Sequence, residues 1–493
     1  MMKIKLSTEL ASTAMGFSVG ILLIIAAAVF SMHVGYNQFG GYDLSPLIDI
    51  SWRFFQGQTP GVDYLNTMPV ILLVFLKLGN YSTIEWANLI VANVFATLLT
   101  FFYIFYATES RRSSLAWVFT TVTIISLPLI YTNHIWHSSL SQLIAICFFY
   151  SSYIFIESSR PSLKIQILLG LSAGLLFVSK QNLAPIPIIF PILILIYNFD
   201  NKWVFIRSSF VGIILILTAS LLFLEMPLQE FLYSQSAILG RAKPDLGMFV
   251  AFAKMKSNYP LIGLTILMFF LAFKSIKNNA TIDRKILILL LFFCAMSLLP
   301  IVTDWDAKLN NLPLPLFVFS IVILKYGSAR AIGYMFISLF FIAVVAFFGG
   351  YSRERMMHVG DFYEKDNLHQ ISTGYFSGFN IGTRMYEVIN EINSVKDAYP
   401  KSDIFFGPRI EFGYALTNSP SPKGFPLWWH PGTSYSLKTQ DYIINNFTEK
   451  TFNILIFLKD DRTRVPSEIL NFINLNYNKN QKYNFLDVYE RNV

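Results

Sequence analysis

Long apolar runs, separated by short polar connections, fill the chain as far as Gly350 and then stop. Runs of about 18–22 residues are the length that a helix needs to cross the hydrocarbon core of a bilayer. We therefore predict about eleven transmembrane helices, two of which (184–198 and 313–325) are short for a full crossing. The predicted spans are 14–35, 84–106, 114–132, 138–157, 163–180, 184–198, 206–225, 260–274, 286–302, 313–325 and 331–350.

The positive charges along the polar connections predict the orientation of these helices. With the N-terminus in the cytoplasm, every inner connection holds at least two cations, whereas the outer connections are poorer or mixed. An odd number of spans then places the C-terminal tail outside. The inner cations are Lys3 and Lys5, Arg111 and Arg112, Arg160 and Lys164, Lys202 and Arg207, Lys274, Lys277, Arg284 and Lys285, and Lys325 and Arg330.

The composition agrees with a membrane protein and argues against other classes. The chain is 54% hydrophobic and 14% charged, below the roughly 25% charged residues of soluble domains. Acids and bases are equal in number over residues 351–493, so the net charge of +8 belongs to the membrane part and reflects its orientation. We expect no nucleic-acid partner, because no phosphate-binding glycine loop accompanies that charge. Cys147 and Cys294 lie inside apolar runs and predict neither a disulfide nor a zinc site.

Residues 351–493 follow a different pattern from residues 1–350. Thr383–Ala398 has helical periodicity, and Pro466–Leu475 is typical of another helix. Asp403–Phe406 and Asn453–Leu458 are short β-branched and aromatic runs, which favour strands. A long segment rich in proline, glycine and aromatic residues separates the two strands. The fold class predicted is an α-helical polytopic membrane domain (1–350) followed by a small extracytoplasmic α/β domain (351–493).

The first outer loop, residues 36–68, holds the most informative pattern of the chain. Ser45-Pro46 is a typical helix start, with a capping hydroxyl before proline in the first turn. Apolar residues follow on one stripe and polar residues opposite, so we predict a helix lying on the bilayer surface that ends near Gly57. Asp43 precedes this helix and Asp63 follows it, just before another short apolar stretch.

Each acid of this loop has a functional and a structural interpretation. Asp43 is a candidate catalytic base, or it caps the helix. Asp63 is a candidate base or orienting group, or an ordinary turn aspartate after Pro60-Gly61. Asp49 is structural, since Arg53 lies one helical turn away as its partner.

Further candidate binding residues lie near the predicted outer ends of spans and in the tail. Lys180 and Gln181 could contact a phosphate or a sugar, although a lysine there also reaches the headgroups without any function. Arg241 and Lys243 could grip a lipid phosphate or be simply solvated. Two acids in DWDAK (304–308) make a weak metal motif, so no metal site and no cofactor is predicted.

The tail adds a pair of opposite charges and a group of aromatic residues. Arg409 and Glu411 could pair with each other or face a substrate. Trp428, Trp429 and His430 offer flat surfaces that could stack on a sugar or dip into the headgroup layer.

The arrangement resembles a known family. An acid after the first span, an interfacial helix, a Gly-x-x-Pro turn with a second acid and then a proline resemble the first outer loop of the GT-C superfamily of integral-membrane glycosyltransferases. SKQNLAPIPI (179–188) is similar to a Lys-Gln-Asn turn of that superfamily, and FFGPRIEFGYA with SPKGFPLWWHPGTSY resembles a bacterial branch allied to O-antigen modification. The superfamily often has Asp-Glu where this chain has Asp43-Leu44, so the choice of base between Asp43 and Asp63 stays open.

The resemblance implies a function, a location and partners. It implies transfer of a hexose, such as glucose, from a polyprenyl-phosphate donor to a glycan or lipid-linked acceptor at the outer face of a bacterial inner membrane. Membrane lipids and the proteins that make and flip the donor are then the expected partners.

The chemistry of such a transfer requires a carboxylate base and cations near the departing phosphate, and direct attack inverts the anomeric centre. A glycan polymerase or ligase is the alternative, although such enzymes usually rely on large mid-chain outer loops rich in arginine. A lipid-linked sugar transporter fits less well, because it predicts internal repeats and charges within the spans.

Overall fold

The structure of the protein is a computed structural model. The described residues are 2–37, 44–66, 68–79, 85–108, 115–132, 135–180, 182–239, 259–278, 284–303, 311–351, 368–372, 377–427, 429, 435, 437–459 and 465–492. The sequence prediction for Asp43 falls outside these ranges, as do those for Gln181, Arg241, Lys243, the DWDAK motif, Trp428 and His430.

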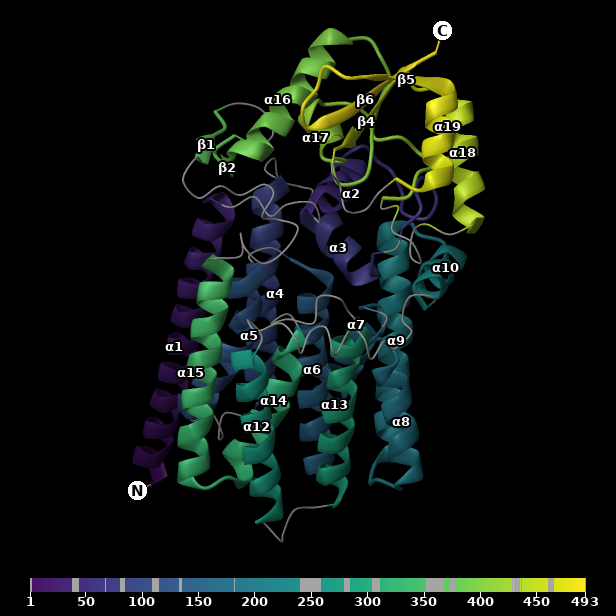
Figure 1. Cartoon of the computed structure of the whole chain (residues 1–493). Helices are drawn as coiled ribbons and strands as arrows, with labels where there is room; N and C mark the ends of the chain where they lie inside the picture. The colour runs from purple at the N-terminus through teal and green to yellow at the C-terminus, as the bar shows by residue number, and fades with distance from the viewer. Residues whose placement is uncertain are drawn as a thin grey trace.

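A bundle of helices forms the N-terminal part of the molecule (Figure 1). Every predicted span corresponds to one helix of the described chain, with ends that differ by a few residues. Six of these helices are long and apolar enough to cross a membrane, so the chain is a multi-pass membrane protein. The helices are α1 (Met2–Asn37), α4 (Glu85–Ala107), α5 (Leu115–Thr132), α6 (His137–Glu157), α7 (Leu163–Phe177), α8 (Ile186–Ile196), α9 (Lys202–Leu224), α12 (Tyr259–Lys277), α13 (Arg284–Thr303), α14 (Pro313–Tyr326) and α15 (Ala329–Tyr351).

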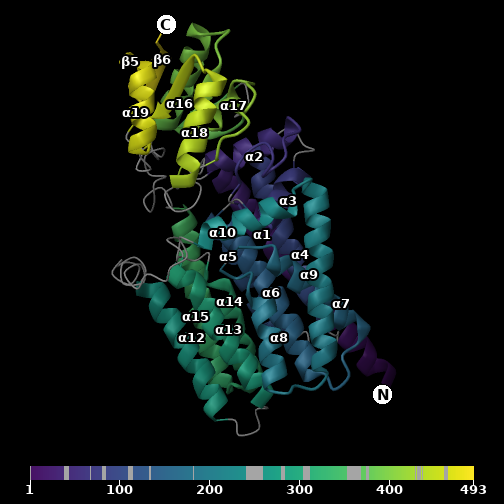
Figure 2. The same cartoon turned by 90° about the vertical axis from the view of Figure 1, so that its right-hand side faces the viewer.

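The two ends of the chain lie at opposite ends of the bundle, and the tail sits on the end away from the N-terminus (Figures 1 and 2). This arrangement agrees with an odd number of crossings. The cytoplasmic location of the N-terminus stays a prediction from charge.

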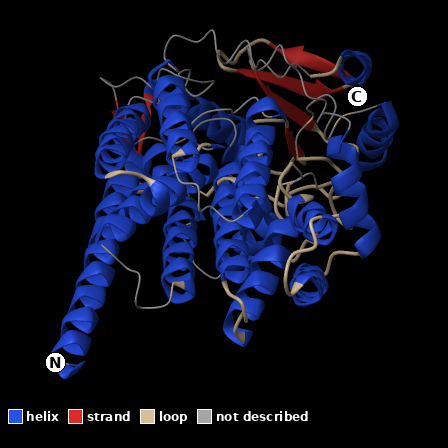
Figure 3. Cartoon of the chain, turned by 90° about the horizontal axis from the view of Figure 1, so that it is seen from below, coloured by secondary structure: helices blue, strands red, loops and turns tan. Residues whose placement is uncertain are grey.

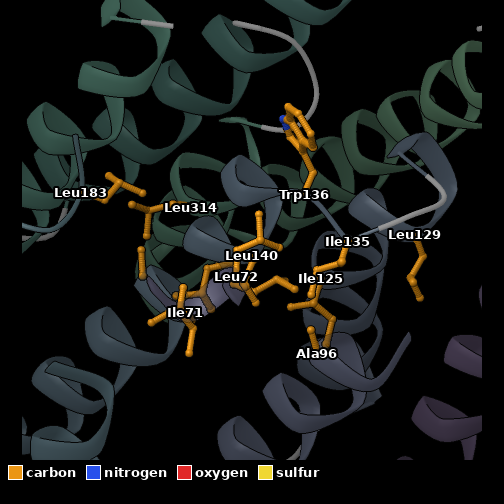
Figure 4. Packing of buried hydrophobic residues seen from close by; sticks show 14 of the residues in the cluster. Ile71, Leu72, Ala96, Ile125, Leu129, Ile135, Trp136, Leu140, Leu183 and Leu314 are labelled. Carbon is orange, nitrogen blue, oxygen red and sulfur yellow. The ribbon is translucent and has the colours of Figure 1, made fainter. Parts of the chain in front are cut away.

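Three shorter helices lie at or near the end of the bundle that carries the tail (Figure 2): α2 (Ser45–Phe55), α3 (Val70–Gly79) and α10 (Leu228–Leu239). Helix α3 is too short to span a bilayer, and half of its residues, Val70–Leu73 and Leu76, are buried instead. Figure 4 shows Ile71 and Leu72 of α3 near Leu140 of α6 and Leu314 of α14.

The tail is the predicted α/β unit (Figure 3). Its larger sheet has the order β3-β4-β6-β5, with β3 parallel to β4 and the other neighbours antiparallel, and β1 pairs with β2 in a separate hairpin. The strands are β1 (Leu368–Gln370), β2 (Asn380–Gly382), β3 (Ile404–Phe406), β4 (Ile454–Leu458), β5 (Tyr477–Asn480) and β6 (Leu486–Arg491). The helices are α16 (Thr383–Ala398), α17 (Gly413–Leu416), α18 (Leu437–Lys450) and α19 (Ser467–Asn476).

Candidate active site

Helix α2 corrects the prediction of a helix lying on the bilayer surface. Its residues Ser45–Phe54 are all buried, and of its eleven residues only Phe55 is exposed. The polar face that the pattern assigned to water is covered by residues 407–427 of the tail, here called the tail loop. An amphipathic pattern cannot distinguish a polar face that meets water from one that meets another polar surface.

The centre of this contact is a buried ion pair. Arg53 Nε donates to Asp49 Oδ2 at 2.7 Å, which confirms the predicted partnership. The tail loop completes it, because Ser421 Oγ donates to Asp49 Oδ1 at 2.6 Å and Arg53 Nη1 donates to the Pro422 carbonyl at 2.8 Å. Burial raises the pKa of Asp49, although Arg53 and Ser421 act in the opposite direction. These hydrogen bonds stabilise the ion pair, because they offset the free-energy cost of removing both charges from water.

Two further side chains, Trp52 and Gln58, form hydrogen bonds between the first outer loop and the tail loop. Gln58 Nε2 donates to the Ser421 carbonyl at 2.6 Å, and the Gln58 amide oxygen accepts from Arg53 at 2.8 Å. Trp52 Nε1 donates to the Ser419 carbonyl at 2.8 Å. We call this set, with Asp49 and Arg53, the polar junction.

Ser45 and Glu411 form a second buried contact between α2 and the tail loop. Ser45 was predicted to cap the helix, but Leu44 occupies the cap position and no side chain bonds there. The Ser45 hydroxyl instead donates to Glu411 Oε2 at 2.6 Å and accepts from the Phe412 amide at 3.1 Å. Burial raises the pKa of Glu411 well above its ordinary value, so the neutral acid is favoured. Its other oxygen, Oε1, is buried without a hydrogen-bond partner among the described residues.

Arg409 lies two residues before Glu411, in a strained backbone conformation. Its φ is +73°, which non-glycine residues rarely adopt, and its side chain is buried. The charge of Arg409 lowers the pKa of Glu411 without overcoming the effect of burial. Both side chains are buried. A direct contact of either one with a substrate stays a prediction.

Asp63 is the candidate base that the structure describes. Its Oδ2 accepts from the Thr59 amide at 2.8 Å, and Lys423 Nζ lies 2.9 Å from its Oδ1. Burial acts to raise the pKa of Asp63, but the Thr59 amide, Lys423 and Arg53 together outweigh it and hold the pKa below its usual value. Asp63 is therefore an ionised carboxylate that joins the first outer loop to the tail loop. The bond to Thr59 also fits its alternative role as a turn aspartate.

Two more of the predicted binding residues can be placed. Lys180 follows α7 and donates from Nζ to Ser138 Oγ at 2.7 Å, so it lies against the start of α6. The prediction that Trp429 contacts a sugar or the headgroup layer is wrong. Its side chain is 3% exposed and packs with Phe405, Phe447 and Phe457 in the aromatic core of the tail. A buried ring in that core cannot stack on a sugar or enter the headgroup layer.

An open groove of about 590 Å³ lies beside the polar junction. Trp52 and Phe55 of α2 line it on one side and Asn418, Pro420 and Ser421 of the tail loop on the other, with Gln56, Gln58 and Lys423 completing it. Lys423, which lines the groove, also forms the ion pair with Asp63.

The sequence did not single out Gln58, Ser421 or Lys423, nor Tyr64, whose ring lies 4.9 Å from the Arg53 guanidinium. The one usable sequence signal was the polarity of the first outer loop, which lies between two apolar runs and contains Gln58 and Tyr64. Among the described residues no group of three or more histidine, cysteine or acidic side chains could hold a metal.

Comparisons with known proteins found similarity among solved structures. No family model matches the chain, and no curated protein matches it. Among solved structures, the chain is similar to ArnT from Cupriavidus metallidurans bound to undecaprenyl phosphate, with 11% identity over 95% of this chain and 97% of that one, and a TM-score of 0.45. A likeness of this size carries no conclusion about activity, so the proposal below rests on the residues themselves.

Proposed function

We propose that the chain is a GT-C-type glycosyltransferase. It moves a hexose, such as glucose, from a polyprenyl-phosphate donor to a glycan or lipid-linked acceptor on the outer face of a bacterial inner membrane. The observation that carries the proposal is the placement of Asp63: an ionised carboxylate at the end of an apolar bundle, bound to an exposed lysine of the tail loop. Carboxylates at the boundary of an apolar bundle suit a substrate whose sugar is in water and whose carrier is in lipid.

The reaction proposed is a direct displacement. The acceptor hydroxyl gives its proton to the carboxylate of Asp43 or Asp63, and its oxygen forms a bond to the anomeric carbon. The bond from that carbon to the phosphate oxygen breaks, and the lipid leaves as a monophosphate. A single attack from the opposite side inverts the anomeric centre.

Cations stabilise the negative charge that grows on the departing phosphate. Lys423 is the described cation nearest to Asp63, and Lys180 is the described one among the predicted phosphate ligands. Arg241 and Lys243 are proposed for the same task. No metal is required, since a phosphate monoester anion is already a good leaving group.

The orientation and the partners belong to the same proposal. The N-terminus is cytoplasmic, the tail is periplasmic, and other proteins make the donor and deliver it to the outer leaflet. Asp43 and Asp63 lie in the first outer loop and not within the membrane-spanning helices. This position favours chemistry at the membrane surface over transport across the bilayer.

The test uses membranes that contain Asp63→Asn or Asp43→Asn, supplied with labelled polyprenyl-phosphate glucose and a glycan acceptor. We expect the variant of the base to lose about 10²–10⁴-fold in kcat, the usual contribution of a general base. In Asp63→Asn the amide oxygen can still accept from Thr59, so the loop keeps its turn. If both variants transfer label at the wild-type rate, the proposal is wrong.

The matched control is Asp200→Asn. Asp200 is an exposed acid that pairs with Lys285 at the other end of the bundle, between α8 and α9. Its loss removes a similar ion pair without touching the outer loop, and we expect wild-type transfer.

A further inference from the structure

An open groove lies between α2 and the tail loop. Its volume of about 590 Å³ falls within the roughly 300–1,000 Å³ of small-molecule sites. It is built by two segments more than 350 residues apart in sequence, so it exists only when the tail is seated on the first outer loop.

One wall of the groove is a flat apolar surface open to water. Phe55 is 65% exposed, and its ring stacks on that of Trp52 with the centroids 5.2 Å apart and 22° between the planes. The hydrogen bond from Trp52 Nε1 to the Ser419 carbonyl fixes the inner ring. The aromatic wall is therefore held in place before any ligand arrives.

The floor and the opposite rim are polar. Gln56 accepts from the Ser421 amide at 3.0 Å and donates to the Ser419 carbonyl at 3.3 Å, so the floor is rigid. Asn418 is exposed on the rim, with a positive φ of 51° that turns the chain there. Lys423 is 63% exposed and forms the ion pair with Asp63. A preformed site loses little conformational entropy when it binds.

We infer that this groove binds one sugar residue of the acceptor glycan. A pyranose ring has a face of C–H groups that can pack against Phe55 and an edge of hydroxyl groups that can reach Asn418, Gln56 and Lys423. A lipid chain would cover the exposed side chains of Asn418 and Lys423 with hydrocarbon, which costs free energy. A phosphate would find only Lys423, whose charge Asp63 already balances.

This assignment rests on the proposed function for the identity of the glycan as acceptor. It adds where the acceptor is held. Lys423 is the one residue that both lines the groove and binds Asp63 among the described residues, so it would link a bound sugar to the proposed base.

The test measures binding without transfer. The full chain in detergent is titrated with the water-soluble polysaccharide that mild acid releases from the envelope of the cells that encode it. We expect Phe55→Ala to weaken binding about tenfold, in line with the loss of an aromatic contact, and Phe55→Tyr to keep the wild-type affinity. Leu475→Ala, at a position 79% exposed on α19, is the matched control and should change nothing.

The outcomes separate this inference from the proposed function. If the wild-type chain does not bind the polysaccharide, or binds it equally well with Phe55→Ala, the groove assignment is wrong. If binding depends on Phe55 but no variant of the chain transfers labelled sugar, the groove stands and the glycosyltransferase proposal fails. If transfer occurs with an acceptor KM that Phe55→Ala leaves unchanged, the acceptor lies elsewhere.

Discussion

Two contacts in this molecule are built by opposite means. Helices α7 and α9 approach each other through glycines: a Cβ on Gly212 would lie 1.9 Å from the Gly170 carbonyl oxygen, and one on Gly174 would lie 2.3 Å from the Gly212 carbonyl oxygen. The polar junction between α2 and the tail loop instead buries an ion pair, glutamines and a serine, each bonded to the other segment or to its neighbour.

The comparison shows how the surroundings decide what a contact requires. Within a bilayer the hydrophobic effect does not drive helices together, because lipid tails are as apolar as the helix surfaces. Helices associate there through the close packing of small residues. At the end of the bundle, water competes for every polar group, so a buried polar contact is stable only where most of its donors and acceptors find partners. The glycine contact between α7 and α9 is therefore sensitive to added side-chain volume. The polar junction is sensitive to the loss of a hydrogen-bond or ion-pair partner.

Removing a partner from the junction should have the largest effect. Asp49→Ala leaves Arg53 buried without its counter-charge, and we expect a loss of about 3–5 kcal/mol in the free energy of unfolding. Chemical denaturation in detergent, with protease cleavage of the tail as a second readout, measures this. Replacing both partners, as in Asp49→Leu with Arg53→Met, should cost less than the sum of the single changes. A loss for Asp49→Ala no greater than that of Asp200→Asn would contradict the assignment of the junction as a buried unit.

Adding volume to the glycine contact should have a smaller but clear effect. Gly212→Ala places a methyl group against the backbone of α7, and we expect a loss of about 1–3 kcal/mol in the free energy of unfolding. The matched control is Gly263→Ala in α12, where a Cβ meets nothing within 4 Å and the better helix propensity of alanine should be neutral or stabilising. Equal unfolding curves for the two variants would show that α7 and α9 are not in close contact.

The smallest effect concerns pH. The pKa of Glu411 is raised in the folded chain, so its contribution to stability is complete below the ordinary value of 4.5 and is lost as the pH rises through the folded-state pKa. Glu411→Gln keeps the shape and the bond from Ser45 but cannot ionise. The Tm of the wild type should therefore fall relative to that of Glu411→Gln as the pH is raised from about 5 to 8.

Glu449→Gln, on the exposed side of α18, is the control for that series. Its Tm should follow the wild type at every pH. If the Glu411→Gln curve also runs parallel to the wild-type curve, Glu411 is not the buried neutral acid described above.

Much of the fold could be predicted from the chain, because long apolar runs and helical periodicity are local signals. The predicted helix Thr383–Ala398 is α16 with the same bounds, and the predicted strands at 403–406 and 453–458 contain β3 and β4. The strand β5 was missed because its sequence, Tyr-Asn-Lys-Asn, is polar and pairs at the edge of the sheet.

The candidate site was predicted in part. The pair formed by Asp49 and Arg53 was predicted correctly from spacing within one segment. The catalytic roles of Asp43 and Asp63 stay predictions. The roles of Ser45 and Trp429 were wrong, since a capping hydroxyl and an interfacial tryptophan look the same in sequence whether or not another segment covers them.

The sequence by itself determined that the chain crosses a membrane many times, that it ends in an α/β tail, and that acids flank its first outer helix, because each of these depends on residues close together in the chain. Tertiary structure alone decided that this helix is covered by the tail, that Glu411 meets Ser45, and that Lys423 meets Asp63. Those contacts join residues about 360 positions apart, and the free energy of burying a polar group depends on partners that no local pattern reveals.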